Sequence, residues 1–188
     1  MSLYRNHLPQ VGGQLFVTDG GIETTLIFHD KLDLPLFAAF HLLKDEAGTA
    51  ALRRYFQTYG NIARSNGVGF ILESPTWRAS ADWGDKLGYS AAALAEANRR
   101  SIALMGELRA EFQGARTPVV VSGCVGPRGD GYDPGNVMSA DEAQAYHAEQ
   151  IGVLARSGAD MVTVAVRRVN IMARPMLHEA CRSRDGPG

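Results

Sequence analysis

The sequence has few cysteines, no excess of either charge and no long apolar run. Its 188 residues include only Cys124 and Cys181, which excludes a disulfide-stabilised scaffold and is typical of a cytoplasmic protein. Nineteen basic residues against twenty acidic ones give a net charge of −1, so we expect no basic surface for nucleic acid. No apolar run reaches the length of a membrane span, and the first ten residues lack the apolar core of a signal peptide. We therefore expect a cytoplasmic protein that binds neither nucleic acid nor a membrane.

The common metal and nucleotide motifs are missing as well. No C-x-x-C, H-x-x-x-H or H-E-x-x-H pattern occurs, so no metal ligand set is predicted. The glycine-rich stretch 123–135 matches neither a dinucleotide fingerprint nor a P-loop, and we interpret it as a long active-site loop. We interpret His147 as a core histidine, because it lies on the apolar face of a predicted helix. We interpret Cys124 as a small buried residue, because no partner base is evident.

Glycine, by contrast, is frequent, and it clusters after short apolar runs. The chain has 21 glycines, above the usual share of about 7%. Four apolar runs predict strands, at 15–18, 69–72, 118–122 and 160–166. Each run is mostly continuous rather than alternating, which is typical of strands covered on both faces.

Three amphipathic segments lie between these runs and predict helices at 46–65, 91–112 and 140–156. Ser139 and Glu142 form a capping box that marks the start of the third helix. In the first helix the apolar side chains recur at helical spacing and define one buried face. These side chains are Leu52, Tyr55, Phe56, Tyr59, Ile62 and Ala63.

This alternation of strands and helices predicts an α/β fold with a parallel sheet. Two architectures fit it: an open doubly wound sheet, and a (β/α)8 barrel, which needs eight units and about 250 residues. The sequence supplies only about four units in 188 residues. The pattern taken alone therefore favours the open sheet.

In both architectures ligands bind beyond the carboxyl ends of the strands. The first strand is followed by Asp19, Gly20, Gly21 and, two positions later, Glu23. Asp19 is suited to hold an amino group, and the glycine N–H groups are suited to hold a carboxylate. The alternative interpretation is a tight turn with the aspartate as a cap.

The second strand is followed by a loop rich in side-chain donors. Its Ser74 and Thr76 hydroxyls are suited to bind a small polar ligand, with Trp77 as a wall. The alternative interpretation is a loop shaped by Pro75 and held by a buried tryptophan.

Three motifs in this order resemble the homocysteine S-methyltransferase family. They lie at 19–26, 73–80 and 122–127, and the resemblance extends from about residue 15 to 166. It implies a (β/α)8 TIM-type barrel, of which this chain supplies an incomplete part of about four units. It also implies transfer of a methyl group to the thiol of homocysteine to give methionine, with a zinc ion held by cysteine thiolates.

The same resemblance assigns roles to the residues after the strands. It implies that Asp19 and Gly20 anchor the amino acid end of homocysteine, with Glu23 as a second candidate. Ser74 and Thr76 occupy the region of a substrate-binding hydroxyl. The expected partners are therefore homocysteine and a methyl donor, and the sequence does not identify the donor.

The sequence departs from the family in its last part. Ala165 stands where family members often carry a glutamate, and the zinc cysteines of the family lie in the later half of the barrel. We therefore expect no zinc ligand in this chain. Residues 167–188 contain five arginines and no lysine, and we interpret them as an atypical basic tail after a half-barrel domain at 1–166.

These departures predict a truncated or frame-shifted product with open sheet edges, which would favour a homo-oligomer. The alternatives to an active methyltransferase are a catalytically inactive half-barrel without its zinc site and an unrelated open α/β protein that binds a small molecule.

Overall fold

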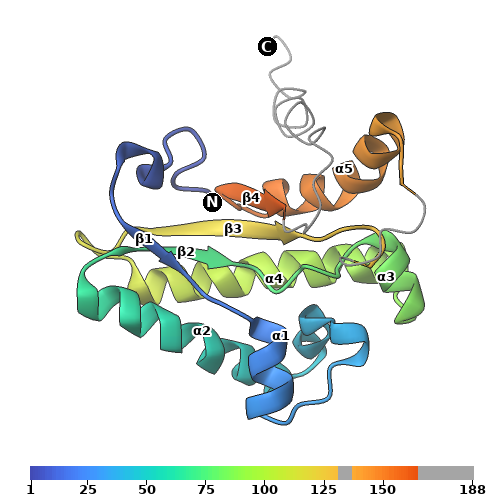
Figure 1. Cartoon of the computed structure of the whole chain (residues 1–188), viewed down its shortest axis with the longest axis horizontal. Coiled ribbons are helices and arrows are strands. Elements are labelled where there is room, and N and C mark those ends of the chain that lie inside the picture. The colour runs from blue at the N-terminus through green and yellow to red at the C-terminus, as the bar shows by residue number, and fades with distance from the viewer. Residues whose placement is uncertain (131–136, 165–188) are drawn as a thin grey trace.

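The computed structural model describes residues 1–130 and 137–164, and its centre is one sheet of four parallel strands (Figure 1). The strands lie in the order β1-β2-β3-β4. They are β1 (Phe16–Thr18), β2 (Gly69–Glu73), β3 (Val119–Val125) and β4 (Met161–Val164). All four predicted strands are confirmed within a few residues, although the end of the fourth prediction, 165–166, lies outside the described residues.

The strand order decides between the two architectures that the sequence pattern allows. Each strand pairs with the next one along the chain, with β1 against β2, β2 against β3 and β3 against β4. A doubly wound sheet reverses its strand order at a switch point, whereas a barrel does not. The α/β class and the incomplete TIM-type barrel are therefore confirmed, and the open doubly wound sheet that the pattern alone favours is wrong.

Three long helices connect these strands: α2 (Glu46–Asn66), α4 (Ala91–Phe112) and α5 (Ala140–Arg156). The predicted capping box at the start of α5 is confirmed, because the Ser139 hydroxyl accepts from the Glu142 N–H and the Glu142 carboxylate accepts from the Ser139 N–H. The short elements were not predicted. They are η1 (Pro9–Gly12), α1 (Ile22–Thr24), η2 (Thr25–His29), η3 (Pro35–Phe37), η4 (Ala39–Lys44) and α3 (Ala81–Lys86).

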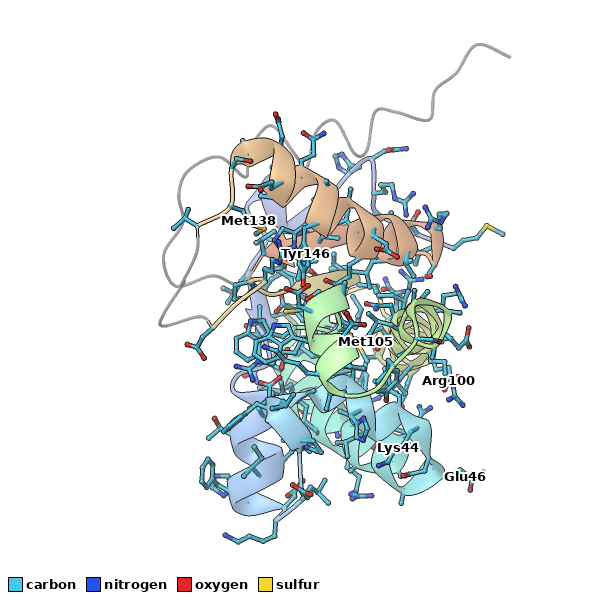
Figure 2. All side chains as sticks on the ribbon, turned by 90° about the vertical axis from the view of Figure 1, so that its right-hand side faces the viewer. Lys44, Glu46, Arg100, Met105, Met138 and Tyr146 are labelled. Atoms are coloured by element: carbon cyan, nitrogen blue, oxygen red, sulfur yellow. The ribbon has the colours of Figure 1, made fainter. Side chains whose placement is uncertain are left out.

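One apolar cluster joins the helices to one face of the sheet. Phe70 and Leu72 of β2 contribute to it, and so do Met105 of α4 and Leu154 of α5. Because a single cluster includes residues of all three long helices, these helices cover the same face, as in the outer layer of a barrel. Met105 lies in the interior, whereas charged side chains such as Lys44 lie at the surface (Figure 2).

The predicted buried face of α2 is confirmed at its central residues but is wrong at Ile62. Leu52, Phe56 and Ala63 are fully buried, but Ile62 is 49% exposed. Adjacent residues of an α-helix are about 100° apart, so Ile62 lies far around the helix from Ala63. Its apolar side chain therefore falls beside the contact face, not within it.

A buried carboxylate closes the amino-terminal end of the sheet. Asp160 is 4% exposed, and its Oδ1 accepts from the backbone N–H groups of Leu3 and Tyr4 at 2.6 and 2.9 Å. Its Oδ2 accepts from the Val121 N–H at 2.9 Å and from Arg109 Nη1 at 3.0 Å. One side chain therefore ties the N-terminal segment, α4, β3 and the start of β4 together.

Within the described parts of the chain, no helix combines the length and the apolar character that crossing a membrane requires.

Candidate functional site

The carboxyl ends of β1, β2 and β3 bring three carboxylates near one thiol. Asp19 follows β1, Glu23 lies in α1, Glu73 ends β2 and Cys124 lies in β3. The charges of all three carboxylates raise the pKa of the Cys124 thiol, although burial is the larger cause. Sequentially distant residues therefore share one electrostatic environment at the end of the sheet where barrel enzymes place their active sites.

Asp19 is the best-defined side chain of this group. The Tyr55 hydroxyl of α2 donates to Asp19 Oδ2 at 2.8 Å, and the Tyr59 hydroxyl donates to the Gly20 carbonyl at 3.0 Å. Burial raises the Asp19 pKa to about 6, the Tyr55 hydrogen bond opposes this shift, and the charge of Glu73 adds to it. The carboxylate is ionised at neutral pH, but it is short of partners.

The glycines after Asp19 shape the turn into α1. Gly21 has a φ of +65°, in the left-handed region that favours glycine. At Gly20 an added Cβ would meet no atom within 4 Å, so the space beside its backbone is open. The predicted contact of a ligand carboxylate with this turn requires such open backbone, and it stays a prediction.

Glu23 lies between a repelling and an attracting charge. Burial raises its pKa, its own backbone N–H lowers it, the charge of Asp19 raises it and that of Arg78 lowers it. The Arg78 guanidinium lies over the ring of Trp83 at 4.0 Å and that of Trp77 at 4.7 Å. These aromatic contacts fix a cation at the edge of the carboxylate group.

Ser74 and Thr76 are buried, with 3% and 0% exposure. The Ser74 Oγ accepts from the Cys124 N–H at 3.0 Å and lies 2.7 Å from Thr76 Oγ1, which donates to the Cys124 carbonyl at 2.6 Å. Both hydroxyls thus join the loop after β2 to β3. Their predicted contact with a ligand stays a prediction. Each hydroxyl has one acceptor lone pair left for a ligand N–H, and only a contact in which the hydroxyl donates requires exchange of one of these bonds.

Trp77 is half-buried and its backbone is held close to β3. A Cβ added at Gly126 would lie 2.2 Å from the Trp77 carbonyl oxygen, so only glycine fits there. The predicted active-site loop 123–135 begins at this contact, but 131–136 lie outside the described residues, as do Ala165, Cys181 and the predicted tail.

The described residues do not fit a zinc site. They include no group of three or more His, Cys, Asp and Glu side chains that could hold a metal ion. Cys124 is buried as predicted, and burial together with the nearby carboxylates raises its pKa well above that of an ordinary thiol. Since the thiolate is the form that binds metal, Cys124 is a poor ligand.

His147 is half-buried, not fully enclosed in the core as we predicted. Burial lowers its pKa, and its Nδ1 has no hydrogen-bond partner within the described parts of the chain. Its place on α5 still agrees with a residue of the helix–sheet contact, because its neighbours along the helix face, Ile151 and Leu154, are buried.

Sequence reasoning missed three residues of this group: Tyr55, Glu73 and Arg78. Tyr55 was assigned only to the apolar face of its helix, yet a tyrosine on a buried face requires a partner for its hydroxyl, and this signal was available. The position of Glu73 at a strand end was equally informative. Arg78 carried no comparable signal, because its aromatic neighbour Trp83 belongs to the unpredicted helix α3.

The arrangement places two carboxylates beside a tyrosine hydroxyl and an open stretch of backbone. Both carboxylates, Asp19 and Glu23, are partly desolvated, and they favour a ligand that brings positive charge and N–H donors. The site is therefore suited to bind an ammonium group.

A family model described as homocysteine S-methyltransferase matches residues 16–167. No curated protein matches the sequence significantly. Two solved structures of the homocysteine methyltransferase MmuM from Escherichia coli have a similar fold. The metallated form has a TM-score of 0.69 and 17% identity over 92% of this chain and 60% of that one. The oxidised form has a TM-score of 0.63 and 19% identity over 82% of this chain and 53% of that one. The chain thus spans about 60% of the length of the metallated structure.

Proposed function

Since the chain belongs to the homocysteine S-methyltransferase family, we propose that it binds homocysteine at the carboxyl ends of β1 and β2. Homocysteine is the acceptor of a methyl group in this proposal, and methionine is the product. The observation that carries the proposal is the carboxylate of Asp19, partly desolvated beside Tyr55 at the end of β1 where the family motif begins. The family match excludes the alternative of an unrelated α/β protein.

The ammonium group of the amino acid is the part that Asp19 recognises. Burial leaves the ionised Asp19 with an unfavourable energy, which its pKa of about 6 expresses. An ammonium group supplies the missing charge and hydrogen bonds, so part of the electrostatic cost of burial is recovered on binding. Glu23 adds a second negative charge near Asp19.

The carboxylate end of homocysteine then lies along the open backbone at Gly20. A Cβ added at Gly20 would have no atom within 4 Å. A ligand can therefore reach the N–H groups of the turn. The Ser74 and Thr76 hydroxyls, which we predicted to bind substrate, hold the neighbouring loop to β3 and take part in binding through their remaining acceptor lone pairs or by exchanging a bond with Cys124.

Methyl transfer additionally requires ionisation of the homocysteine thiol. A free thiol has a pKa near 8.5 and is mainly protonated at neutral pH. The family resemblance implies that zinc supplies this activation, but the described residues do not fit a zinc site. We therefore assign to this part of the chain the binding of the amino acid and no role in activating the sulfur.

A second function follows from the same observation. A half-barrel that lacks a ligand set binds the amino acid without transferring the methyl group. We propose residues 1–166 as this half-barrel and 167–188 as a separate basic tail. Association of two copies along the outer edges of β1 and β4 is part of the proposal, and size-exclusion chromatography with light scattering tests it.

The binding test compares L-homocysteine with 4-mercaptobutanoate, which keeps the thiol and the carboxylate but lacks the ammonium group. Isothermal titration under reducing conditions gives both affinities. We expect homocysteine to bind at least about tenfold more tightly, because a buried charge loses its partner in the other case. Asp19→Asn should remove this preference, and Asp30→Asn, an exposed change nearby, should leave it intact. Equal affinities for the two ligands would refute the proposal.

Mass spectrometry of methionine formed from homocysteine then separates the two functions. S-methylmethionine and S-adenosylmethionine serve as donors, with zinc added. Product formation supports the transferase, and binding without product supports the inactive half-barrel.

A further inference from the structure

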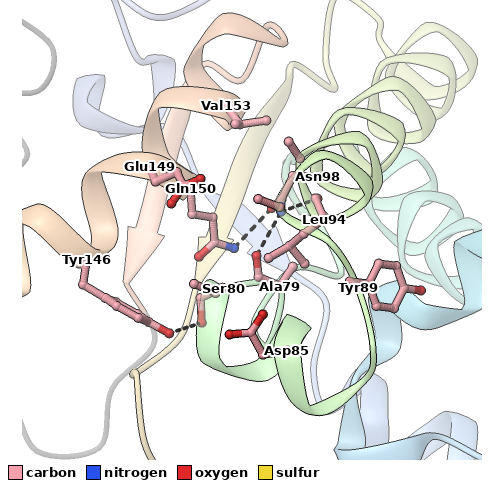
Figure 3. A pocket seen from close by; sticks show the side chains of 13 residues that line it. Ala79, Ser80, Asp85, Tyr89, Leu94, Asn98, Tyr146, Glu149, Gln150 and Val153 are labelled. Atoms are coloured by element: carbon pink, nitrogen blue, oxygen red, sulfur yellow. Dashed lines mark hydrogen bonds between the residues drawn. The ribbon is translucent and has the colours of Figure 1, made fainter.

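A polar cavity lies between α3, α4 and α5, on the helix-covered side of the sheet. It is a cavity of about 70 Å³. Asn98 and Gln150 form its buried wall, with 2% and 5% exposure, while Asp85 and Glu149 lie exposed at its mouth (Figure 3). None of the residues of the candidate site at the strand ends lines it, so the cavity is separate from that site.

The hydrogen-bond network fixes the orientation of the Gln150 amide. Asn98 Nδ2 donates to the carbonyls of Ala79 and Leu94 at 2.9 and 3.0 Å, so Asn98 Oδ1 is left as an acceptor. Gln150 Nε2 donates to that Oδ1 at 3.2 Å and to the Thr76 carbonyl at 2.9 Å. A flipped Gln150 amide would place an oxygen against two acceptors, so this orientation is the favourable one.

Gln150 Oε1 is consequently an acceptor without a donor. It has no hydrogen-bond partner in the described parts of the chain, although the side chain is almost completely buried. Such an unpaired acceptor is costly, on the order of 1–3 kcal/mol. Figure 3 shows the oxygen on the side of the amide that faces Tyr146 and Ser80, opposite the bond to Asn98.

The charges around the cavity have one sign. Asp85 and Glu149 line it, and among its described lining residues none is basic. The Tyr146 hydroxyl does not serve the free acceptor, because it donates to Ser80 Oγ at 3.0 Å. The cavity therefore offers a buried acceptor and two carboxylates to a ligand that supplies N–H donors and positive charge.

We propose that this cavity binds the primary ammonium group of a small organic amine. One N–H donates to Gln150 Oε1, and the charge lies toward Glu149 and Asp85. Since about 10–15 Å³ of such space is enough for one water molecule, a cavity of about 70 Å³ accommodates a group of a few heavy atoms such as methylammonium. A metal ion is a poorer occupant, because the described residues contain no group of three metal-ligating side chains. An amino acid is poorer too, because its carboxylate meets Asp85 and Glu149.

The test is a ¹H–¹⁵N NMR titration of the full chain with methylammonium, tetramethylammonium and glycine. Methylammonium has both the charge and the N–H donors, tetramethylammonium has only the charge, and glycine adds a carboxylate. We expect saturable shifts of the Gln150 side-chain amide with methylammonium alone. Equal shifts with tetramethylammonium, or no saturable shift with methylammonium, would overturn the proposal; the latter leaves a water molecule as the occupant.

Two substitutions test the location without removing any bond of the network. Ala95 lines the cavity, so Ala95→Leu should fill it and abolish the methylammonium response, whereas Ala92→Leu on the exposed side of α4 should not. Glu149→Gln should weaken binding about threefold, as expected for an exposed charge, and Glu46→Gln should have no effect. An unchanged response in folded Ala95→Leu would contradict the proposed location. This site does not depend on homocysteine binding, so either proposal can fail while the other stands.

Discussion

Two aspartates at opposite ends of the same sheet have opposite surroundings. Asp160, at the amino-terminal end, accepts four hydrogen bonds, one of them from the guanidinium of Arg109. Asp19, at the carboxyl end, has Tyr55 as its one side-chain donor among the described residues, and burial raises its pKa to about 6. The first carboxylate is fully satisfied by the protein, whereas the second is left short of partners.

This difference shows how the barrel divides stability from binding. A carboxylate that the protein satisfies completely has no capacity for a ligand, and it holds segments together. A carboxylate that is buried without enough partners costs stability, and it regains that energy only from something that binds. Barrels generally place structural residues at the amino-terminal face and functional residues at the carboxyl-terminal face, and the binding role that we propose for Asp19 agrees with that division.

The largest effect on stability should come from a substitution of Asp160, the carboxylate that the protein satisfies completely. Asp160→Asn replaces an acceptor by an NH₂ group, which faces the existing N–H donors, and leaves the partly buried Arg109 guanidinium without its counter-charge. We expect a loss of about 3–5 kcal/mol in the free energy of unfolding, measured by urea denaturation. Asp30→Asn, an exposed change, should stay within about 0.5 kcal/mol. A loss below about 1 kcal/mol at Asp160 would contradict the structural role of this carboxylate.

Asp19→Asn should raise the free energy of unfolding at pH 7, whereas Asp160→Asn should lower it. Asparagine still accepts the Tyr55 hydroxyl hydrogen but carries no charge, so the cost of burying an ion is removed. The pKa of about 6 against an ordinary 3.8 corresponds to a gain of up to about 3 kcal/mol in the free energy of unfolding. The same variant should lose its preference for homocysteine. A variant less stable than the parent chain would show that Asp19 stabilises the fold.

The pH dependence of stability is an independent test of whether the ionised Asp19 destabilises the fold. Because the folded-state pKa of Asp19 lies above its ordinary value, ionisation favours the unfolded chain. The cost is complete above about pH 6, decreases as the pH falls and is absent below about 3.8. The stability difference between Asp19→Asn and the parent chain should therefore shrink from pH 7 to pH 4, as followed by urea midpoints.

A substitution at Thr76 should have a smaller effect on stability, and it tests whether Thr76 also contacts the ligand. Thr76→Val keeps the shape but removes the donor to the Cys124 carbonyl, and we expect a loss of about 1–3 kcal/mol. Thr58→Val, whose hydroxyl bonds an exposed helix carbonyl, serves as the matched control. A lower affinity for homocysteine in the folded Thr76 variant supports the predicted ligand contact, and an unchanged affinity assigns Thr76 to the scaffold alone.

The regular part of the fold could be predicted because its signals are local. Apolar runs give the strands, the spacing of Leu52, Phe56 and Ala63 gives the face of α2, and Ser139 with Glu142 gives the start of α5. The barrel topology depends on contacts between distant segments and has no local signal in the sequence. Only the resemblance to a family indicated it. The short helical elements between α1 and α2 were missed because no periodic pattern of sufficient length identifies them.

The candidate site was predictable only where a residue follows a strand directly. Asp19 and Gly20 do so, and Glu23 follows within the same turn. Tyr55 reaches Asp19 from the middle of a helix 36 positions away, and Gln150 reaches the Thr76 carbonyl from 74 positions away. Such contacts depend on how helices are placed over the sheet, which a single sequence does not specify.

The anchor at Asp160 also sets an order of events during synthesis. The amide groups of Leu3 and Tyr4 leave the ribosome well before their acceptor, which lies 157 and 156 residues later in the chain. At about 5–20 residues per second, the segment around Leu3 waits roughly 8–30 seconds for this partner. During that time β1, β2 and β3 pair through shorter loops, and this segment docks after the strands that follow it.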